Sequence, residues 1–214
     1  MKKVFILLLI TLLLLTSGIA YSKEIDTKLV GKVVVIDPGH GGKDSGTSVS
    51  GIYEKDLNLD ISLLLRDELI KSGATVLMTR DGDYDLSSPN VSRRKKSDFD
   101  NRINLINDSE ADLYLSIHIN YLEESKYYGA QVFYTGDNGL LANIIQKSFN
   151  TYLKSPMKEK KLSNDIYMYK KLNVPGVLIE CGFMSNSIER KKMQSDEYQK
   201  LLVDSIIKGL NKYY

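Results

Sequence analysis

Three short apolar runs, each followed by a titratable residue, constrain the fold of this chain most strongly. The three pairs are Val33–Ile36 before His40, Leu113–Ile117 before His118, and Val177–Ile179 before Glu180. Stretches with helical spacing of apolar residues separate these runs. Such alternation is typical of largely parallel sheets with helices on both faces. The sequence therefore predicts an α/β fold, built on a single mixed, mostly parallel twisted sheet.

Hydrophobic spacing places the individual elements along the chain. Leu57, Ile61, Leu65 and Leu69 recur at helical spacing, and Gly73 supplies a stop signal. The expected strands are 32–37, 74–79, 112–117, 130–134 and 177–180, with 130–134 at an edge of the sheet. The expected helices are 56–71, 98–107, 140–153 and 197–212. Together they predict one domain over residues 31–214, with no internal repeat and no second module.

Residues 1–22 have the pattern of a targeting segment. Lys2 and Lys3 precede the apolar stretch Val4–Leu15, and Ala20 offers a small residue at a cleavage site. Two interpretations stay open, because the stretch is also at the lower limit for spanning a bilayer. It is either a secretory signal that is removed or an anchor that contacts the membrane. In both cases we expect the domain to be exported and extracytoplasmic.

The charge distribution excludes one class of partner. Lys2 and Lys3 account for the formal net charge of +2, so the rest of the chain is neutral overall. This balance argues against a nucleic-acid binder that relies on bulk charge. The exception is Arg93–Lys96, a basic run in the long polar segment 81–97. Segments of this kind are usually functional or disordered. It is either a solvated surface loop or a rim that contacts an anionic substrate or a partner protein.

Two histidines and two glutamates fall where ligands gather in such sheets, at the carboxyl ends of strands. Glu54 follows His40 by fourteen residues, just ahead of the first predicted helix. His118 and Glu180 follow strands that should be buried. Two histidines and one glutamate form a zinc ligand set, which leaves the second glutamate as a base. A buried carboxylate with a raised pKa would suit that work near neutral pH.

Structural alternatives exist for each of these residues. His118 could be a hydrogen-bonded core histidine, Glu54 a carboxylate that complements a helix dipole, and Glu180 one half of a salt bridge. Their shared position at the strand ends favours the metal site. A zinc peptidase or a deacetylase would use other motifs, such as HExxH, which the sequence lacks.

Several motifs, in order, resemble those of one enzyme family. They are DPGHGG at 37–42, EKD at 54–56, Thr79–Arg80, SIHIN at 116–120 and PGVLIECGFMSN at 175–186. From about Lys32 to Tyr214 the chain resembles zinc-dependent N-acetylmuramoyl-L-alanine amidases of the type-3 group. The resemblance implies hydrolysis of the amide that joins the lactyl group of N-acetylmuramic acid to L-alanine in peptidoglycan.

The resemblance also implies roles for individual residues. His40, Glu54 and His118 would hold Zn²⁺, Glu180 would be the catalytic carboxylate, and Asn120 and Arg102 would contact the substrate. The short length, the apolar N-terminus and the lack of wall-binding modules resemble family members that act on the spore cortex. There, removal of the peptide precedes formation of muramic-δ-lactam. A vegetative cell-separation amidase and a non-catalytic wall-binding scaffold remain alternatives.

The same comparison sets expectations for place and partners. The protein would act in the cell wall or forespore envelope. No inserted helix that could plug the site is visible in the sequence, so regulation would come from an activating or metal-supporting protein partner. Segment 81–97 is the expected contact for that partner.

Overall fold

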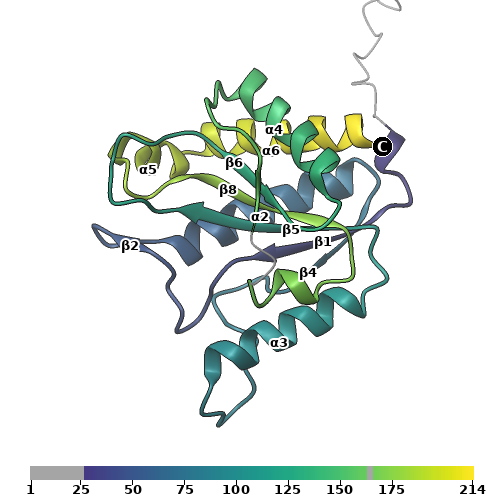
Figure 1. The fold of residues 1–214 in the computed structure, drawn as a ribbon, viewed down its shortest axis with the longest axis vertical. Helices are drawn as coiled ribbons and strands as arrows, with labels where there is room; N and C mark the ends of the chain where they lie inside the picture. Colours follow the sequence, from purple (N-terminus) through teal and green to yellow (C-terminus); the bar gives the residue numbers. More distant parts are fainter. Residues whose placement is uncertain (1–26, 163–165) are drawn as a thin grey trace, which may run out of the picture.

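The computed structural model describes residues 27–162 and 166–214, which fold around a six-stranded sheet (Figure 1). In spatial order the strands are β4 (Thr75–Met78), β1 (Val33–Pro38), β5 (Leu113–Asn120), β8 (Gly176–Phe183), β6 (Gln131–Tyr134) and β7 (Lys160–Lys161). Neighbouring strands run parallel, except that β6 is antiparallel to β8. The sheet is therefore mixed and mostly parallel, which confirms the predicted fold class.

Helices cover both faces of the sheet (Figure 1). They are α2 (Glu54–Lys71), α3 (Arg94–Asn107), α4 (Gly139–Tyr152), α5 (Ser187–Met193) and α6 (Asp196–Tyr213), with 3₁₀ turns η1 (Thr27–Leu29) and η2 (Tyr169–Lys171). Apolar residues of α2, α4 and α6 share one buried cluster with the sheet. Those of α3 share a second cluster with the segment around η2. The first cluster lies on one face of the sheet, and the second cluster lies on the other face.

Strand β1 shows how the sequence builds both layers. Val34 and Ile36 lie in the cluster of α2, whereas Val35 lies in the cluster of α3. Successive side chains of a strand point to opposite faces, so an unbroken apolar run suits a strand that is covered on both sides. Strand β5 divides its apolar residues between the two clusters in the same way, and β8 contributes to the first cluster. The apolar runs that predicted these three strands are therefore the centre of the sheet.

Several boundaries differ from those that hydrophobic spacing predicts. Helix α2 begins at Glu54, so this residue lies in the first helical turn rather than ahead of the helix. Helix α3 begins at Arg94 and takes in the end of the basic run. Strands β5 and β8 continue past His118 and Glu180. Polar residues that serve the site interrupt the apolar pattern there, although the backbone ladder continues.

The prediction that 130–134 lies at an edge of the sheet is wrong. Strand β6 pairs with β8 on one side and with β7 on the other. Strand β7 is two exposed lysines, which carry no apolar signal. The hairpin β2 (Ser48–Val49) and β3 (Ile52–Tyr53) and the short helix α5 also escape prediction. Elements this short depend on tertiary contacts more than on periodicity.

The predicted targeting segment, residues 1–22, lies outside the described residues. Within 27–162 and 166–214, no helix combines the length and the apolar character that crossing a membrane requires.

A buried ion-pair network joins α3 to the end of β1. Arg102 Nη1 lies 2.7 Å from Asp37 Oδ1, and Arg102 Nε lies 2.9 Å from Asp98 Oδ2. All three side chains are buried. Burial alone would raise the pKa of Asp37, but Arg102 and the hydroxyls of Thr79 and Ser116 lower it below the usual value. This pair therefore stabilises the fold above the unfolded-state pKa of about 4, and the stabilisation is lost as the pH falls through the folded-state pKa.

We expect Arg102→Met to lower the free energy of unfolding by about 3–5 kcal/mol at pH 7, because it leaves two buried carboxylates without a cation. Burial should then raise the pKa of Asp37 in the variant, so its deficit should shrink as the pH falls from 7 to 5. Denaturant unfolding at both pH values measures this. The control is Arg66→Met, which removes an ion pair between Arg66 and Asp67 at the surface and should cost less than about 1 kcal/mol. Equal deficits in the two variants would contradict the prediction.

Candidate metal centre and catalytic pocket

The glycine-rich turn after β1 carries His40 over the end of the sheet. His40 itself has a φ of 62°, in the left-handed region, and Gly41 has a φ of 128°. A Cβ on Gly41 would lie 2.3 Å from the carbonyl oxygen of Tyr84, so the position requires glycine. Arg102 Nη2 donates to the carbonyl oxygen of His40 at 2.6 Å. Strained backbone of this kind persists only where its surroundings hold it, and here they fix the direction of the imidazole.

His40, Glu54 and His118 converge on one point. Glu54 Oε1 lies 3.1 Å from His40 Nε2 and 3.1 Å from His118 Nδ1. One donor atom from each of the three residues lies within 4.8 Å of the other two. Ligands of a tetrahedral zinc ion, with bonds near 2.0–2.1 Å, lie about 3.3 Å apart. The structure therefore brings the three predicted ligands together at a spacing that fits a metal ion, and two nitrogens with one carboxylate oxygen suit zinc.

Glu54 is held in place by backbone groups. Its Oε2 accepts from Thr47 N at 2.9 Å, and its Oε1 accepts from Ile119 N at 3.2 Å. Burial opposes ionisation, but hydrogen bonds and charge interactions with His118 and His40 outweigh it and lower the pKa of Glu54. Glu54 is therefore an anion that faces both imidazoles.

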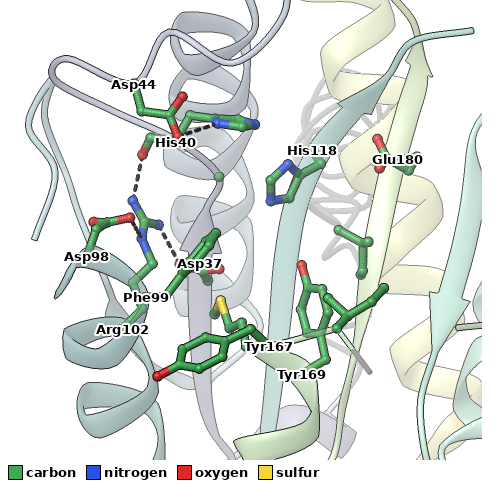
Figure 2. A pocket seen from close by; sticks show the side chains of 14 residues that line it. Asp37, His40, Asp44, Asp98, Phe99, Arg102, His118, Tyr167, Tyr169 and Glu180 are labelled. Carbon is green, nitrogen blue, oxygen red and sulfur yellow. Dashed lines mark hydrogen bonds and ion pairs between the residues drawn. The ribbon is translucent and has the colours of Figure 1, made fainter. Parts of the chain in front are cut away.

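Asp44 holds the other side of the His40 ring, a contact that the motif analysis missed. His40 Nδ1 lies 3.0 Å from Asp44 Oδ2 (Figure 2). This contact leaves Nε2 to face Glu54. Carboxylates in this position orient histidines that bind metals. Burial lowers the pKa of His40, but Asp44 and Glu54 together raise it to about 9. The cluster thus favours positive charge at its centre. Its only signal in the sequence was an aspartate four residues after His40.

Glu180 lies beside His118 because β5 and β8 pair in register there. Figure 2 shows both side chains at the same pocket. Among the described residues, Glu180 Oε2 is buried and has no hydrogen-bond partner. Burial raises the pKa of Glu180 to about 8, and the charge of Glu54 adds to the shift. A carboxyl group with such a pKa can take up and release a proton near neutral pH.

The pocket in front of these residues has a volume of about 240 Å³. Arg102 lines it, but its guanidinium nitrogens bind Asp37, Asp98 and the carbonyl oxygens of Pro38 and His40. Arg102 therefore supports the turn that carries His40. Asn120 ends β5 and does not line this pocket. The opposite wall contains Tyr167 and Tyr169, which no sequence motif indicated.

Segment 81–97 is anchored to the start of α3. Asp85 forms an ion pair with Arg94, and Leu86 N donates to Asp98 Oδ1 at 2.7 Å. Lys95 Nζ lies 3.5 Å from Asp44 Oδ2, so the basic run reaches the residue that orients His40. The segment thus borders the group formed by His40, Glu54 and His118.

Comparison with known proteins identifies the class. The family profile described as N-acetylmuramoyl-L-alanine amidase matches residues 34–212. The chain belongs to this family of peptidoglycan amidases.

The chain is similar to several individual members of this family. The chain is 40% identical over 192 residues to a germination-specific N-acetylmuramoyl-L-alanine amidase of Bacillus subtilis, covering 87% of this chain and 81% of that protein. It is 30% identical to the amidase LytC of the same organism, over 90% of this chain and 38% of LytC. Among solved structures, the CwlD amidase of Clostridioides difficile, in complex with the GerS lipoprotein, matches with a TM-score of 0.81 and 38% identity. That match covers 85% of this chain and 98% of the other.

Gly39 tests how closely the cluster is packed. A Cβ at this position would lie 2.2–2.6 Å from three ring atoms of His118, although the backbone itself would accept alanine. We expect Gly39→Ala to displace the imidazole and weaken binding of a divalent metal at least about tenfold, because a misplaced ligand costs one of three bonds. Competition with a chromogenic chelator measures the affinity. Gly139→Ala, where the added atom meets only the ring of Tyr134 at 3.3 Å, is the control. Unchanged affinity in Gly39→Ala would refute this placement of His118.

Proposed function

We propose that this protein is a zinc-dependent amidase that removes stem peptides from muramic acid in the spore cortex, as a step toward muramic-δ-lactam. The convergence of His40, Glu54 and His118 beside Glu180, whose Oε2 is buried and has no hydrogen-bond partner among the described residues, is the observation that carries the chemistry. The 40% sequence identity of this chain to a germination-specific amidase supports the assignment to the spore cortex. The proposal includes export: a catalytic domain from residue 31 onward would follow an N-terminal signal or anchor.

The three clustered side chains would hold the metal. A zinc ion bound there would polarise the lactyl carbonyl and acidify water at its open position. Asp44 keeps the Nδ1 side of His40 occupied, so that Nε2 is the nitrogen offered to the ion. Backbone N–H groups keep the Glu54 carboxylate aimed at the same point. The donor set is thereby preorganised.

Glu180 would move the proton. Its Oε2 accepts a proton from the attacking water as the water oxygen adds to the lactyl carbonyl carbon. The same oxygen then donates that proton to the alanine nitrogen as the carbon–nitrogen bond breaks. Its raised pKa lets it hold the proton between the two steps. Asn120 and Arg102 would have supporting roles. Asn120 would contact a part of the substrate that lies outside the pocket, and Arg102, which lines the pocket, would fix the turn that carries His40.

We expect Glu180→Gln to release stem peptide from muramyl-peptide fragments about 10²–10⁴-fold more slowly than the unaltered protein, because glutamine can neither take nor return the proton. Mass spectrometry of products that begin at L-alanine measures the rate, and zinc content should stay the same. Glu197→Gln, in the exposed first turn of α6, is the matched control.

A second experiment tests the role in the spore cortex. In a sporulating strain that lacks its germination-specific amidase, the unaltered chain should restore muramic-δ-lactam and Glu180→Gln should not. Peptide release in vitro without restored lactam would favour the alternative, a vegetative cell-wall amidase. Zinc binding without release of peptide by any variant would favour a wall-binding scaffold.

We further propose that a protein partner docks on segment 81–97. Support comes from the solved complex of the CwlD amidase with a lipoprotein, and from the position of this segment beside the metal cluster. Val91 at the tip of the segment is 40% exposed. We expect Val91→Asp to lose a lipoprotein that co-purifies with the tagged protein from sporulating cells. Leu140→Asp, on an exposed site of α4, should retain it. Equal recovery with both variants would contradict this docking site.

A further inference from the structure

Tyr169 forms the floor of the catalytic pocket and has no part in the chemistry described so far. It lies in η2 and lines the pocket together with His118 and Glu180. Figure 2 shows its hydroxyl pointing toward these two side chains. The phenolic oxygen lies 3.2 Å from Ser116 Oγ, so the hydroxyl is held in a fixed place.

Asp37 sets the direction of this hydrogen bond. Ser116 Oγ lies 2.8 Å from Asp37 Oδ2, and Arg102 and Thr79 bind the other carboxylate oxygen. An ionised carboxylate can only accept, so Ser116 donates its single hydrogen to Asp37. Ser116 then has no hydrogen left for Tyr169. The Tyr169 hydroxyl must therefore donate to Ser116, and it turns only lone pairs toward the pocket.

We propose that Tyr169 is a substrate-positioning residue that accepts a hydrogen bond from a secondary-amide N–H of the muramyl peptide. The inference rests on the proposed amidase function and deepens it. A substrate carbonyl oxygen at this place would meet the lone pairs of Tyr169 and be repelled. The pocket thus selects an N–H over a C=O, and this selection orients the scissile amide between His118 and Glu180.

Apart from the scissile amide itself, two parts of the substrate carry such an N–H close to the bond that is broken. One is the acetamido group of N-acetylmuramic acid, and the other is the amide that follows L-alanine. Two analogues of a muramyl dipeptide separate them. In the first, an O-acetyl group replaces the acetamido group. In the second, an ester replaces the amide after L-alanine. Each removes one N–H and keeps the shape.

The experiment compares steady-state constants of the full chain, loaded with zinc, on the parent and both analogues. We expect KM to rise about three- to tenfold on one analogue, the usual effect of one neutral hydrogen bond, with a smaller change in kcat. Tyr169→Phe should show the raised KM already on the parent and no further rise on that analogue. Ser116→Ala should also reduce the discrimination, because it frees the Tyr169 hydrogen to face the pocket.

Tyr167→Phe is the matched control. Tyr167 lines the same pocket, but its hydroxyl donates to Asp100 at 2.5 Å, so this variant should keep the discrimination of the unaltered protein. Equal discrimination in Tyr169→Phe and the unaltered protein, or no discrimination by the unaltered protein, would overturn the inference while leaving the amidase function intact. Failure of the unaltered protein to cleave the parent would overturn both. A structural role alone would change activity on all three substrates by the same factor.

Discussion

The buried ion pair between Asp37 and Arg102 holds the catalytic end of the sheet together. The Asp37 carboxylate accepts hydrogen bonds from Thr79, at the end of β4, and from Ser116, on strand β5. The Arg102 guanidinium donates to Asp98, on helix α3, and to the His40 carbonyl, in the turn after β1. The pair thus connects four separate parts of the chain. A buried charge is tolerated only when it is paired and hydrogen-bonded. Here the contacts with Asp98 and with the His40 carbonyl also position residues that line the pocket. Stability and site geometry therefore share one set of interactions.

The electrostatics of the site give Glu54 and Glu180 opposite pKa shifts. Glu54 receives backbone N–H groups and faces two imidazoles, and these lower its pKa. Within the described part of the chain, the Oε2 of Glu180 is buried and has no hydrogen-bond partner, and the desolvation raises the pKa of Glu180 to about 8. When environments push the pKa values of two carboxyl groups apart, the groups suit different tasks. The first favours binding a cation, and the second favours carrying a proton.

Hydrophobic periodicity predicts the central strands and long helices because these elements are covered by apolar neighbours, as Val34 and Leu65 are. It also places His40, His118 and Glu180 at one end of the sheet, because parallel strands share a direction. Strand β7 and helix α5 escape prediction because two exposed lysines or a seven-residue helix carry no periodic signal. Asp44 and Tyr169 escape because their contacts with His40 and Ser116 arise from the path of a loop.

The two sides of the pocket are held in place by different kinds of interaction. His118 and Glu180 sit on paired strands inside the sheet, where ladder hydrogen bonds on both sides fix the backbone. The segment that carries Tyr169 is held instead by a few side-chain hydrogen bonds, among them two of Asn107, which donates to the Lys171 carbonyl and accepts from Asn173 N. Substitutions in that segment can reshape the pocket wall without moving His118 or Glu180. The fold thus places these two side chains on rigid strands and the facing wall on a segment that can vary independently.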